Sequence, residues 1–367
     1  MEDQSKFSPL KRGAVIGILG DGQLGRMISM AASRLGFKTH IYGPNNNGSA
    51  VHVCSKSTVG PYEDLDAIRD FASECDVVTY EFENVPEFTA KAAMTSAPLR
   101  PGLTALKTAQ DRLVEKTFLR DTAKVPVADF EDITNVFDLK RAVKKMGCPC
   151  VLKTRRFGYD GKGQFVIKSE ADIETAWNAI KEQPAILEAF VGFKREVSII
   201  AARGRNGATA AYPLIENVHK NHILHTSTAP ADGHDGKAKA FARDILKQLD
   251  YIGVIGIEFF EMDTGDLIVN EIAPRVHNSG HWTQDAGCID QFELHIRAIA
   301  GWPLGQIQLK HGVQMTNLIG ADIEALDTFA HEPDTFIHAY GKKEVRKGRK
   351  MGHVNRIIYV PRGKLNR

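Results

Sequence analysis

The sequence predicts two architectures in one chain, an α/β domain in the first hundred residues and an α+β region after it. In the first part, apolar runs typical of buried strands alternate with helical stretches, as in an open parallel sheet with helices on both faces. In the second part, short strands are joined by glycine-rich turns and interrupted by amphipathic helices. Pro98, Pro101 and Gly102 mark the boundary between the two parts.

The expected elements of the first part alternate in type. Residues 14–19 form a continuous apolar run of the buried-strand kind, and a glycine turn and a helical stretch through Leu35 follow it. We expect a second strand over residues 38–42, a helix over 65–74 and a third strand over 76–80. This alternation predicts βαβ units.

A long helix is expected over residues 103–122, and it leads into the second part. The amphipathic patterns beyond it predict helices over 170–181, 237–249 and 292–300. Runs of β-branched and apolar residues bounded by turn residues predict strands over 150–153, 164–168, 185–188, 196–203, 208–213, 254–261 and 266–272.

The composition is that of a globular enzyme. The chain has 367 residues, a net charge of +2 and 25% charged residues, so no broad basic surface for nucleic acid or an anionic membrane is expected. No apolar run approaches the roughly 20 residues that span a bilayer, and the polar, acidic start is unlike a signal or transit peptide. Five scattered cysteines indicate a reducing compartment, and we expect a cytoplasmic protein. Cys148-Pro149-Cys150 has no second Cys/His pair at a suitable spacing and is expected to be structural.

A glycine turn, Gly20-Asp-Gly-Gln-Leu-Gly25, follows the first expected strand and opens the first helix. It is either a tight turn or an anion site at a helix N-terminus. NAD binding would need an acidic residue at the end of the second strand, where the sequence has Ile41-Tyr-Gly-Pro44. We therefore predict that the turn contacts substrate, through Gln23 and Leu24.

A second glycine-rich turn lies between the strands over 150–153 and 164–168. Gly158, Gly161 and Gly163 fall within six residues and are surrounded by cations, so their amides could cover a polyphosphate. Lys153, at the end of an apolar strand, could bind phosphate as a point charge. The alternative is an ordinary basic hairpin loop, and the spacing is not that of a P-loop.

Two glutamates are predicted to face each other across a hairpin. Asp263-Thr-Gly-Asp266 is a strong turn signal, and a hairpin centred between Thr264 and Gly265 places Glu258 opposite Glu271. Like charges at such a pair destabilise it, and a bound Mg²⁺ would reverse that effect because it prefers oxygen ligands. Two solvated surface acids are the alternative, which the apolar character of both strands disfavours.

Several motifs together resemble a known family. The segment Phe157-Gly-Tyr-Asp-Gly-Lys-Gly-Gln164 and the two glutamates resemble the ATP-grasp superfamily. Asn270-Glu-Ile-Ala-Pro-Arg-Val-His-Asn-Ser-Gly-His-Trp282, Gly22-Gln-Leu-Gly-Arg26 and Tyr80-Glu-Phe-Glu-Asn-Val85 are similar to the N5-carboxyaminoimidazole ribonucleotide synthetases (PurK). The resemblance covers nearly the whole chain.

The resemblance implies three domains and a homodimer. Residues 1–105 would form a Rossmann-like pre-ATP-grasp domain, 106–300 the ATP-grasp domain and 301–367 a small C-terminal domain that completes the substrate site. ATP would lie between two sheets, with its phosphates on Arg112 and Lys153 under a lid over 158–164. The implied ATP-binding residues are Arg112, Lys153, Gly158, Tyr159, Asp160, Gly161, Lys162, Gly163, Gln164, Glu188, Ala189, Phe190, Val191, Glu196, His219, Asn270 and Glu271.

Within that set, residues 188–191 would bind adenine through main-chain groups, and Glu196 would bind the ribose hydroxyls with His219 nearby. Glu258 and Glu271, with Asn270, would hold one or two Mg²⁺ ions.

The implied reaction is the carboxylation of 5-aminoimidazole ribonucleotide. Bicarbonate attacks the γ-phosphate of ATP, and the resulting carboxyphosphate delivers CO₂ to the exocyclic amine of the ribonucleotide. Arg275, His277 and Asn278 fall on the motif that handles bicarbonate. The implied substrate contacts are Gln23, Leu24, Glu81, Tyr159, Asp160, Lys342 and Arg349, the last two at the substrate phosphate.

Two departures and three alternatives accompany this interpretation. Lys347 stands where the family usually has proline, which predicts a less rigid loop of similar charge, and the segment after Asn366 is short for a final family helix.

Another ATP-grasp ligase using formate or an amino acid is disfavoured by residues 275–281. An NAD-linked oxidoreductase is disfavoured by the end of the second strand, and a silent nucleotide-binding regulator by the intact lid and acidic pair.

Overall fold

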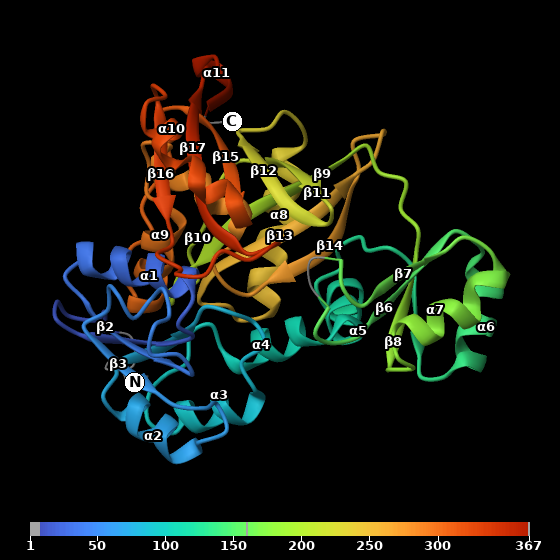
Figure 1. Cartoon of the computed structure of the whole chain (residues 1–367), viewed down its shortest axis with the longest axis horizontal. Helices are drawn as coiled ribbons and strands as arrows, with labels where there is room; N and C mark the ends of the chain where they lie inside the picture. Colours follow the sequence, from blue (N-terminus) through green and yellow to red (C-terminus); the bar gives the residue numbers. More distant parts are fainter. Residues whose placement is uncertain (1–7, 159–160, 366–367) are drawn as a thin grey trace.

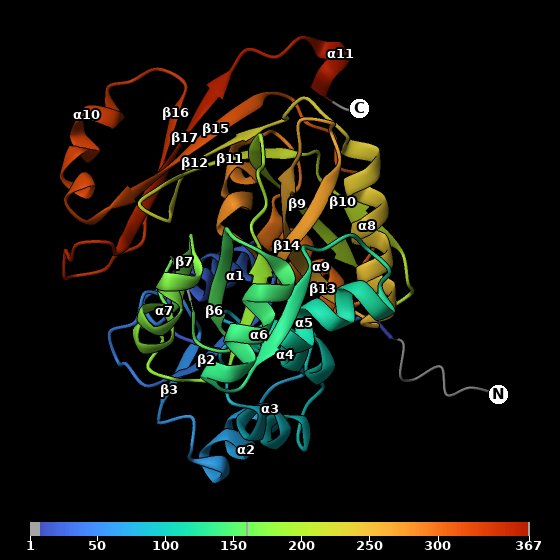
Figure 2. The same cartoon turned by 90° about the vertical axis from the view of Figure 1, so that its right-hand side faces the viewer.

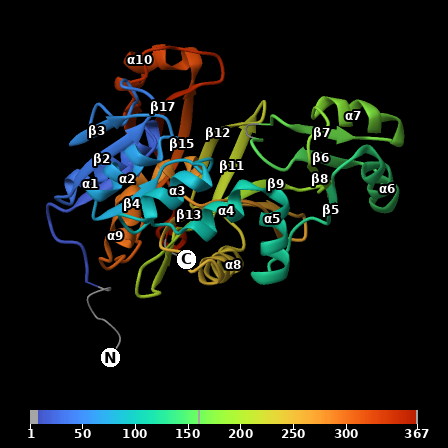
Figure 3. The ribbon, with the colours of Figure 1, turned by 90° about the horizontal axis from the view of Figure 1, so that it is seen from below.

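The computed structural model describes residues 8–158 and 161–365. They form three sheets, and Figure 1 shows the N-terminal domain in blue, a large central sheet, and a small green domain that projects from it. Seen from below, the N-terminal and small domains lie on opposite sides of the large sheet (Figure 3). None of the helices in the described residues is long and apolar enough to cross a membrane.

The N-terminal sheet is parallel, as predicted, with strand order β3-β2-β1-β4. The order places β1 between β2 and β4, so the carboxyl ends of β1 and β4 flank the switch point where ligands bind in such sheets. An additional short strand, β3, was not predicted. The elements are β1 (Val15–Leu19), α1 (Gln23–Arg34), β2 (Lys38–Gly43), β3 (Lys56–Val59), α2 (Leu65–Ser73), β4 (Val77–Tyr80) and α3 (Glu87–Met94).

The single long helix predicted over residues 103–122 is wrong. The segment breaks into α4 (Leu103–Gln110), α5 (Arg112–Thr117) and a π-helical turn (Phe118–Thr122). Asp111 adopts an extended backbone with φ −131°, and its carboxylate accepts hydrogen bonds from the amides of residues 113 and 114. Aspartate is a strong helix N-cap, so it begins a new helix here rather than continuing the old one.

The small domain is an antiparallel sheet of order β5-β8-β6-β7 with two helices packed on it (Figure 2). The glycine-rich turn joins β6 to β7, as predicted, and Tyr159 and Asp160 lie outside the described residues. Cys148 is exposed, Cys150 is buried, and both are free thiols. The elements are β5 (Phe130–Ile133), α6 (Val136–Met146), β6 (Cys150–Thr154), β7 (Gln164–Ile167), α7 (Ile173–Ala179) and β8 (Ala185–Ala189).

Within the described residues, nine strands form the large sheet, in the order β14-β13-β9-β11-β12-β15-β17-β16 with β10 on β9. Because β12 pairs with β15, the strands beyond residue 300 continue the sheet of the preceding residues. The strands are β9 (Arg195–Arg203), β10 (Thr209–Ala211), β11 (Ile215–Lys220), β12 (Ile223–Ala229), β13 (Gly253–Glu261), β14 (Leu267–Ala273), β15 (Gly312–Ile319), β16 (Thr335–Ala339) and β17 (Lys350–Ile358).

Two helices cover this sheet, α8 (Asp235–Gln248) and α9 (Gln291–Ala300), and both were predicted. Helix α9 also packs on α1 of the N-terminal domain. Ile28 of α1 and Ile296 of α9 are fully buried in one hydrophobic cluster, so the two domains share a core. This shared core fixes the switch point of the parallel sheet relative to the large sheet.

Candidate active site

A cavity of about 350 Å³ lies where the three sheets meet. Most of the residues that the sequence assigned to ATP, metal and bicarbonate line it. The predicted residues in its lining are Gln23, Leu24, Arg112, Lys153, Gly158, Gly161, Lys162, Gln164, Glu196, His219, Glu258, Asn270, Glu271, Arg275, His277 and Asn278.

Glu258 on β13 stands directly opposite Glu271 on β14, as predicted, but the predicted turn centre is wrong by half a residue. Near the turn, Phe259 pairs with Val269, a register centred on Thr264 itself. A β-bulge between residues 258 and 259 takes up the extra residue and restores the predicted pairing beyond it. Bulges of this kind redirect side chains, and this one lies inside the cavity wall.

The bulge leaves oxygen atoms suited to a divalent cation. The side-chain oxygen Asn270 Oδ1 is buried without a hydrogen-bond partner among the described residues, and it lines the cavity beside Glu271. Burial, and then the charge of Glu271, raise the pKa of Glu258. Two facing carboxylates and an unpaired amide oxygen fit a hard cation such as Mg²⁺.

Arg112 at the start of α5 reaches the same carboxylate pair. Its Nη1 lies 3.1 Å from Glu271 Oε2, and its Nη2 donates to the carbonyl of Gly158 at 3.4 Å. Arg112 therefore connects the acidic pair to the first residue of the lid.

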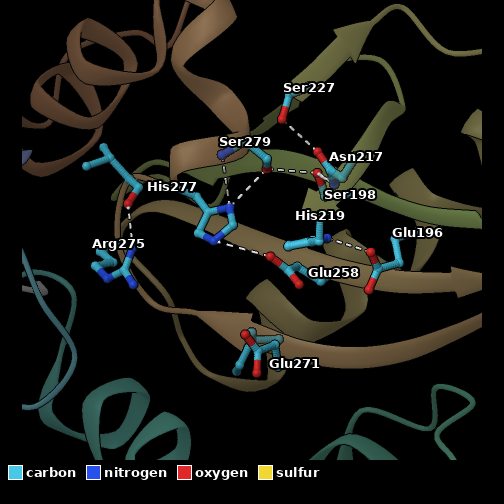
Figure 4. Close-up of polar contacts among 12 residues, drawn as sticks. Glu196, Ser198, Asn217, His219, Ser227, Glu258, Glu271, Arg275, His277 and Ser279 are labelled. Carbon is cyan, nitrogen blue, oxygen red and sulfur yellow. Dashed lines mark hydrogen bonds and ion pairs between the residues drawn. The ribbon is translucent and has the colours of Figure 1, made fainter. Parts of the chain in front are cut away.

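Arg275, His277 and Asn278 follow β14 and line the cavity. Figure 4 shows Arg275 and His277. Arg275 donates to Glu83; burial would raise the pKa of Glu83, but the guanidinium outweighs it and lowers this pKa to about 2. Burial and the charge of Arg275 lower the pKa of His277 to about 3, so its ring is neutral. Both polar atoms of the Asn278 amide are buried without a partner among the described residues, which suits an anion with donor and acceptor atoms.

On the nucleotide side, the structure gives the Glu188 side chain a contact that was not predicted. Its carboxylate is buried between Lys153, 3.0 Å away, and Lys116, 3.4 Å away. Burial would raise the pKa of Glu188, but the two ammonium groups lower it to about 2. The amide of Ala189 donates to the carbonyl of Asp129. Glu188 therefore orients Lys153, and among the four expected hinge residues only 190 and 191 lie beyond the end of β8.

Glu196 and His219 come from neighbouring strands and contact each other. Their carboxylate and Nδ1 atoms lie 2.5 Å apart, and both line the cavity (Figure 4). Burial would lower the pKa of His219, but the hydrogen bond to Glu196 outweighs it and raises this pKa.

The glycine turn after β1 wraps around a carboxylate of the chain itself. Glu81, which follows β4, accepts hydrogen bonds from the amides of Gly22 and Gly25. A Cβ atom at Gly20 or Gly22 would lie within 2.5 Å of the Glu81 side chain, so neither position has room for another residue. The group that accepts hydrogen bonds at this helix N-terminus is therefore the Glu81 side chain, and Gln23 and Leu24 lie in the cavity lining.

Lys342 and Arg349 lie near each other in the loop between β16 and β17. Burial and the charge of Arg349 lower the pKa of Lys342 to about 8. Lys342 donates to the carbonyl of Lys350 at 2.7 Å, and Arg349 donates to the carbonyl of Glu344 at 3.0 Å. Of the predicted site residues that the structure describes, those outside the cavity lining are Glu81, Gly163, Glu188, Ala189, Phe190, Val191, Lys342 and Arg349.

Four charged lining residues were missed, Glu83, Glu115, Arg155 and Lys350. Glu83 lies in the quoted motif 80–85, and its position two residues after Glu81 at a strand end is a usable signal. Lys350 ends the basic run that contains Arg349. Glu115 was hidden inside the expected long helix; burial and then Glu271 raise its pKa to about 8.

Comparisons with known proteins agree with this geometry. Models of three domain families match the chain: the ribonucleotide synthetase preATP-grasp domain over residues 14–110, the ATP-grasp domain over 118–292 and the phosphoribosylaminoimidazole carboxylase C-terminal domain over 314–358. The N5-carboxyaminoimidazole ribonucleotide synthase of Brucella melitensis is 48% identical over 95% of this chain and 97% of its own length. That of Pseudomonas aeruginosa is 42% identical over 92% and 93%.

Solved structures show the same similarity. The N5-carboxyaminoimidazole synthetase of Staphylococcus aureus complexed with ADP matches with a TM-score of 0.92 and 36% identity, over 96% of this chain and 95% of that one. The Aspergillus clavatus enzyme in complex with ADP and 5-aminoimidazole ribonucleotide matches with a TM-score of 0.88 and 29% identity, over 95% and 94%. The chain belongs to the N5-carboxyaminoimidazole ribonucleotide synthase family.

Proposed function

We infer that this protein carboxylates 5-aminoimidazole ribonucleotide to N5-carboxyaminoimidazole ribonucleotide, with ATP and bicarbonate, in purine biosynthesis. The family relationship supports the reaction, and one observation on the site carries it: a neutral histidine, an arginine and an unsatisfied buried amide line the cavity beside the acidic pair. That arrangement fits a small oxyanion held next to a polyphosphate.

Phosphoryl transfer from ATP to bicarbonate depends mainly on positioning and on charge neutralisation. We propose that Lys153, oriented by Glu188, and Arg112 bind the ATP phosphates under the lid over 158–164. Residues 188–191 would contact adenine through main-chain groups, and Glu196 with His219 would contact the ribose. Arg275, with Asn278, would hold bicarbonate in line with the γ-phosphate, and its pairing with Glu83 keeps the guanidinium in place.

Mg²⁺ fits the oxygen atoms of Glu258, Asn270 and Glu271, and we propose that these residues hold one or two ions. When bound, the metal would neutralise charge on the triphosphate. The chain contributes the ligand geometry, because the bulge places the amide of Asn270 beside the two carboxylates.

We propose that the amine of the ribonucleotide lies near Glu81 and the lid residues 159–160, and that Lys342 and Arg349 bind its 5′-phosphate. The charge of Glu81 raises the pKa of Lys342, although the larger effect of burial lowers it. This interaction supports a position of the two side chains near each other. Carboxyphosphate would break down to CO₂ and phosphate within the closed cavity, and the amine would add to the CO₂. We further propose a cytoplasmic homodimer with small-molecule substrates only, on the basis of the family resemblance.

A coupled assay of ADP release tests this function. Full turnover is expected only with ATP, bicarbonate and 5-aminoimidazole ribonucleotide together. Formate or glycine in place of bicarbonate serves as the control for other ATP-grasp reactions. Equal turnover with either replacement would show that the assignment is wrong.

A further inference from the structure

A line of buried hydrogen bonds runs from the large sheet to His277 (Figure 4). The Ser227 hydroxyl donates to Asn217 Oδ1 at 2.8 Å, and Asn217 Nδ2 donates to Ser198 Oγ at 2.8 Å. Ser198 Oγ lies 2.8 Å from Ser279 Oγ. Ser279 Oγ then lies 2.9 Å from His277 Nδ1, and all four residues before the histidine are at most 5% exposed.

The amide of Asn217 gives this line a direction. An NH₂ group can only donate, so Ser198 Oγ accepts from Asn217 and uses its own hydrogen elsewhere. Among the residues that the structure describes, the other partner of that hydroxyl is Ser279. Ser198 therefore donates to Ser279, which donates in turn to His277 Nδ1. If Ser279 donated to Ser198 instead, the Ser198 hydroxyl hydrogen would be buried without an acceptor among the described residues, which would destabilise the fold.

The backbone favours the same result. The main-chain amide of Ser279 also points at His277 Nδ1, 3.4 Å away, because the His277 side chain caps the turn that starts at residue 278. A main-chain amide cannot accept, so this contact also favours an Nδ1 without a proton. At 3.4 Å it is weaker than the 2.9 Å contact of Ser279 Oγ, which therefore carries most of the preference. A histidine with an unprotonated Nδ1 is neutral and has its hydrogen on Nε2.

We propose that Ser227, Asn217, Ser198 and Ser279 are positioning residues that lock His277 in the Nε2–H form, so that its ring faces the cavity as a hydrogen-bond donor. Nε2 lies 3.4 Å from Glu258 Oε1, on the cavity side. A donor at this place binds an oxyanion and cannot remove a proton through the same atom. Together with the proposed function, this makes His277 the group that holds an oxygen of bicarbonate or of its phosphorylated form, and leaves proton removal to other groups.

The tautomer can be measured directly on the whole protein. Two-bond ¹H–¹⁵N correlation spectra of ¹⁵N-histidine-labelled protein distinguish Nδ1–H, Nε2–H and the doubly protonated ring, and a His277→Gln variant assigns the signals. We expect the Nε2–H form in the wild type. Ser279→Ala should reduce that form, and Ser279→Thr, which keeps the hydroxyl, should restore it. Ser29→Ala is the matched control, because Ser29 is a fully buried serine on α1 outside this line.

The kinetics separate a positioning role from a merely structural one. Ser279→Ala should raise the KM for bicarbonate about tenfold, as expected for one hydrogen bond to an anion, and leave the KM for ATP within about twofold. Nδ1–H in the wild type, or an unchanged tautomer in Ser279→Ala, would overturn the proposal. A changed tautomer with an unchanged KM for bicarbonate would overturn the anion-holding role. If His277 has the Nε2–H form and this form depends on Ser279, but no carboxylation is detected, the proposed function is wrong. The proposal that the four residues fix the tautomer of His277 is then still supported.

Discussion

Glu258 and Glu271 repel each other, and Glu271 also forms an ion pair with Arg112. Burial and mutual repulsion raise the pKa of Glu258, whereas Glu271 keeps an ion pair with Arg112. The protein without metal can therefore relieve the repulsion by protonating Glu258. The two carboxylates become fully charged together only when a cation joins them.

Glu271→Gln tests the acidic pair. Turnover should fall by at least about a hundredfold, because a charged metal ligand facing the triphosphate is lost. The free energy of unfolding without metal should change by less than about 1 kcal/mol, because relief of repulsion offsets the weakened pair between Arg112 and the partly exposed carboxylate of Glu271. Initial rates over a Mg²⁺ titration and urea unfolding measure the two effects. Normal Mg²⁺-dependent turnover in the variant would contradict the assigned role of the hairpin.

Glu115 gives a prediction for pH. Its folded pKa is about 8 and its ordinary value is 4.5, so the folded protein keeps a proton that the unfolded chain loses in between. The group therefore lowers the free energy of unfolding as the pH rises, by up to about 1.4 kcal/mol per pH unit between the two values. Glu115→Gln should remove this slope, since its amide oxygen can still accept from Ile272 N. If Glu115→Gln raised the free energy of unfolding equally at pH 5 and pH 8, the raised pKa assigned to Glu115 would be wrong.

Arg349 tests the acceptor end. The 5′-phosphate does not react, so binding it only orients the amine. Arg349→Ala should weaken ribonucleotide binding by about 2 kcal/mol, seen as a higher KM, and leave the KM for ATP unchanged. Arg346→Ala is the matched control, because Arg346 is an exposed neighbour paired with Glu344. A higher KM for ATP alone would mean that the acceptor phosphate is placed elsewhere.

The residues of the site could be predicted where they belong to a sequence motif. Their contacts could be predicted less well where they depend on which side chains the fold buries together. The cavity contains the predicted Arg275, His277 and Asn278 because they follow one another in sequence after a strand. The ion pair of Glu188 with Lys116 was not predicted, since Lys116 is distant in sequence and comes from the helix that the sequence did not separate. A long-range ion pair has no local signature.

At the scale of elements, periodicity predicted β1, β2 and β4 of the first domain and, among the later strands, β6 to β10, β13 and β14. The strands β3, β5, β11, β12 and β15 to β17 were not predicted. Periodicity failed at Asp111, where a capping side chain outweighed the continuous helical pattern, and at the β11–β12 hairpin, whose polar residues hid the strands. The bulge between residues 258 and 259 was not visible in the sequence either, because register depends on packing beyond the turn.

The lid is the element whose dynamics should change most. It is anchored at both ends, by Arg112 on the carbonyl of Gly158 and by the amide of Thr154 on the carbonyl of Gly163, and Gly161 packs against His222. Hydrogen exchange over residues 158–163 should slow when ATP and Mg²⁺ are added, because phosphates order the glycine amides. The exposed turn at residues 206–207 is the internal control. Exchange that stays the same at saturating nucleotide would exclude a lid function.

At the scale of the whole molecule, three sheets converge on one cavity because their relative positions are fixed by shared packing. The core common to α1 and α9 joins the parallel sheet to the large one, and the strands beyond residue 300 extend that sheet. Local patterns predicted separate domains, but they contain no information on a sheet shared between them. Motifs distant in sequence nevertheless indicated one site, because a triphosphate, a metal and an acceptor must meet for the reaction.

The central claim is that bicarbonate is activated by phosphorylation within this cavity, and the transfer of ¹⁸O tests it most directly. Bicarbonate labelled with ¹³C and ¹⁸O is supplied with ATP, Mg²⁺ and 5-aminoimidazole ribonucleotide. Because the bicarbonate oxygen that attacks the γ-phosphate stays on phosphorus when carboxyphosphate breaks down, one ¹⁸O should appear in each inorganic phosphate and the ¹³C in the carbamate of the product. Phosphate without ¹⁸O, or a product without ¹³C, would contradict the account.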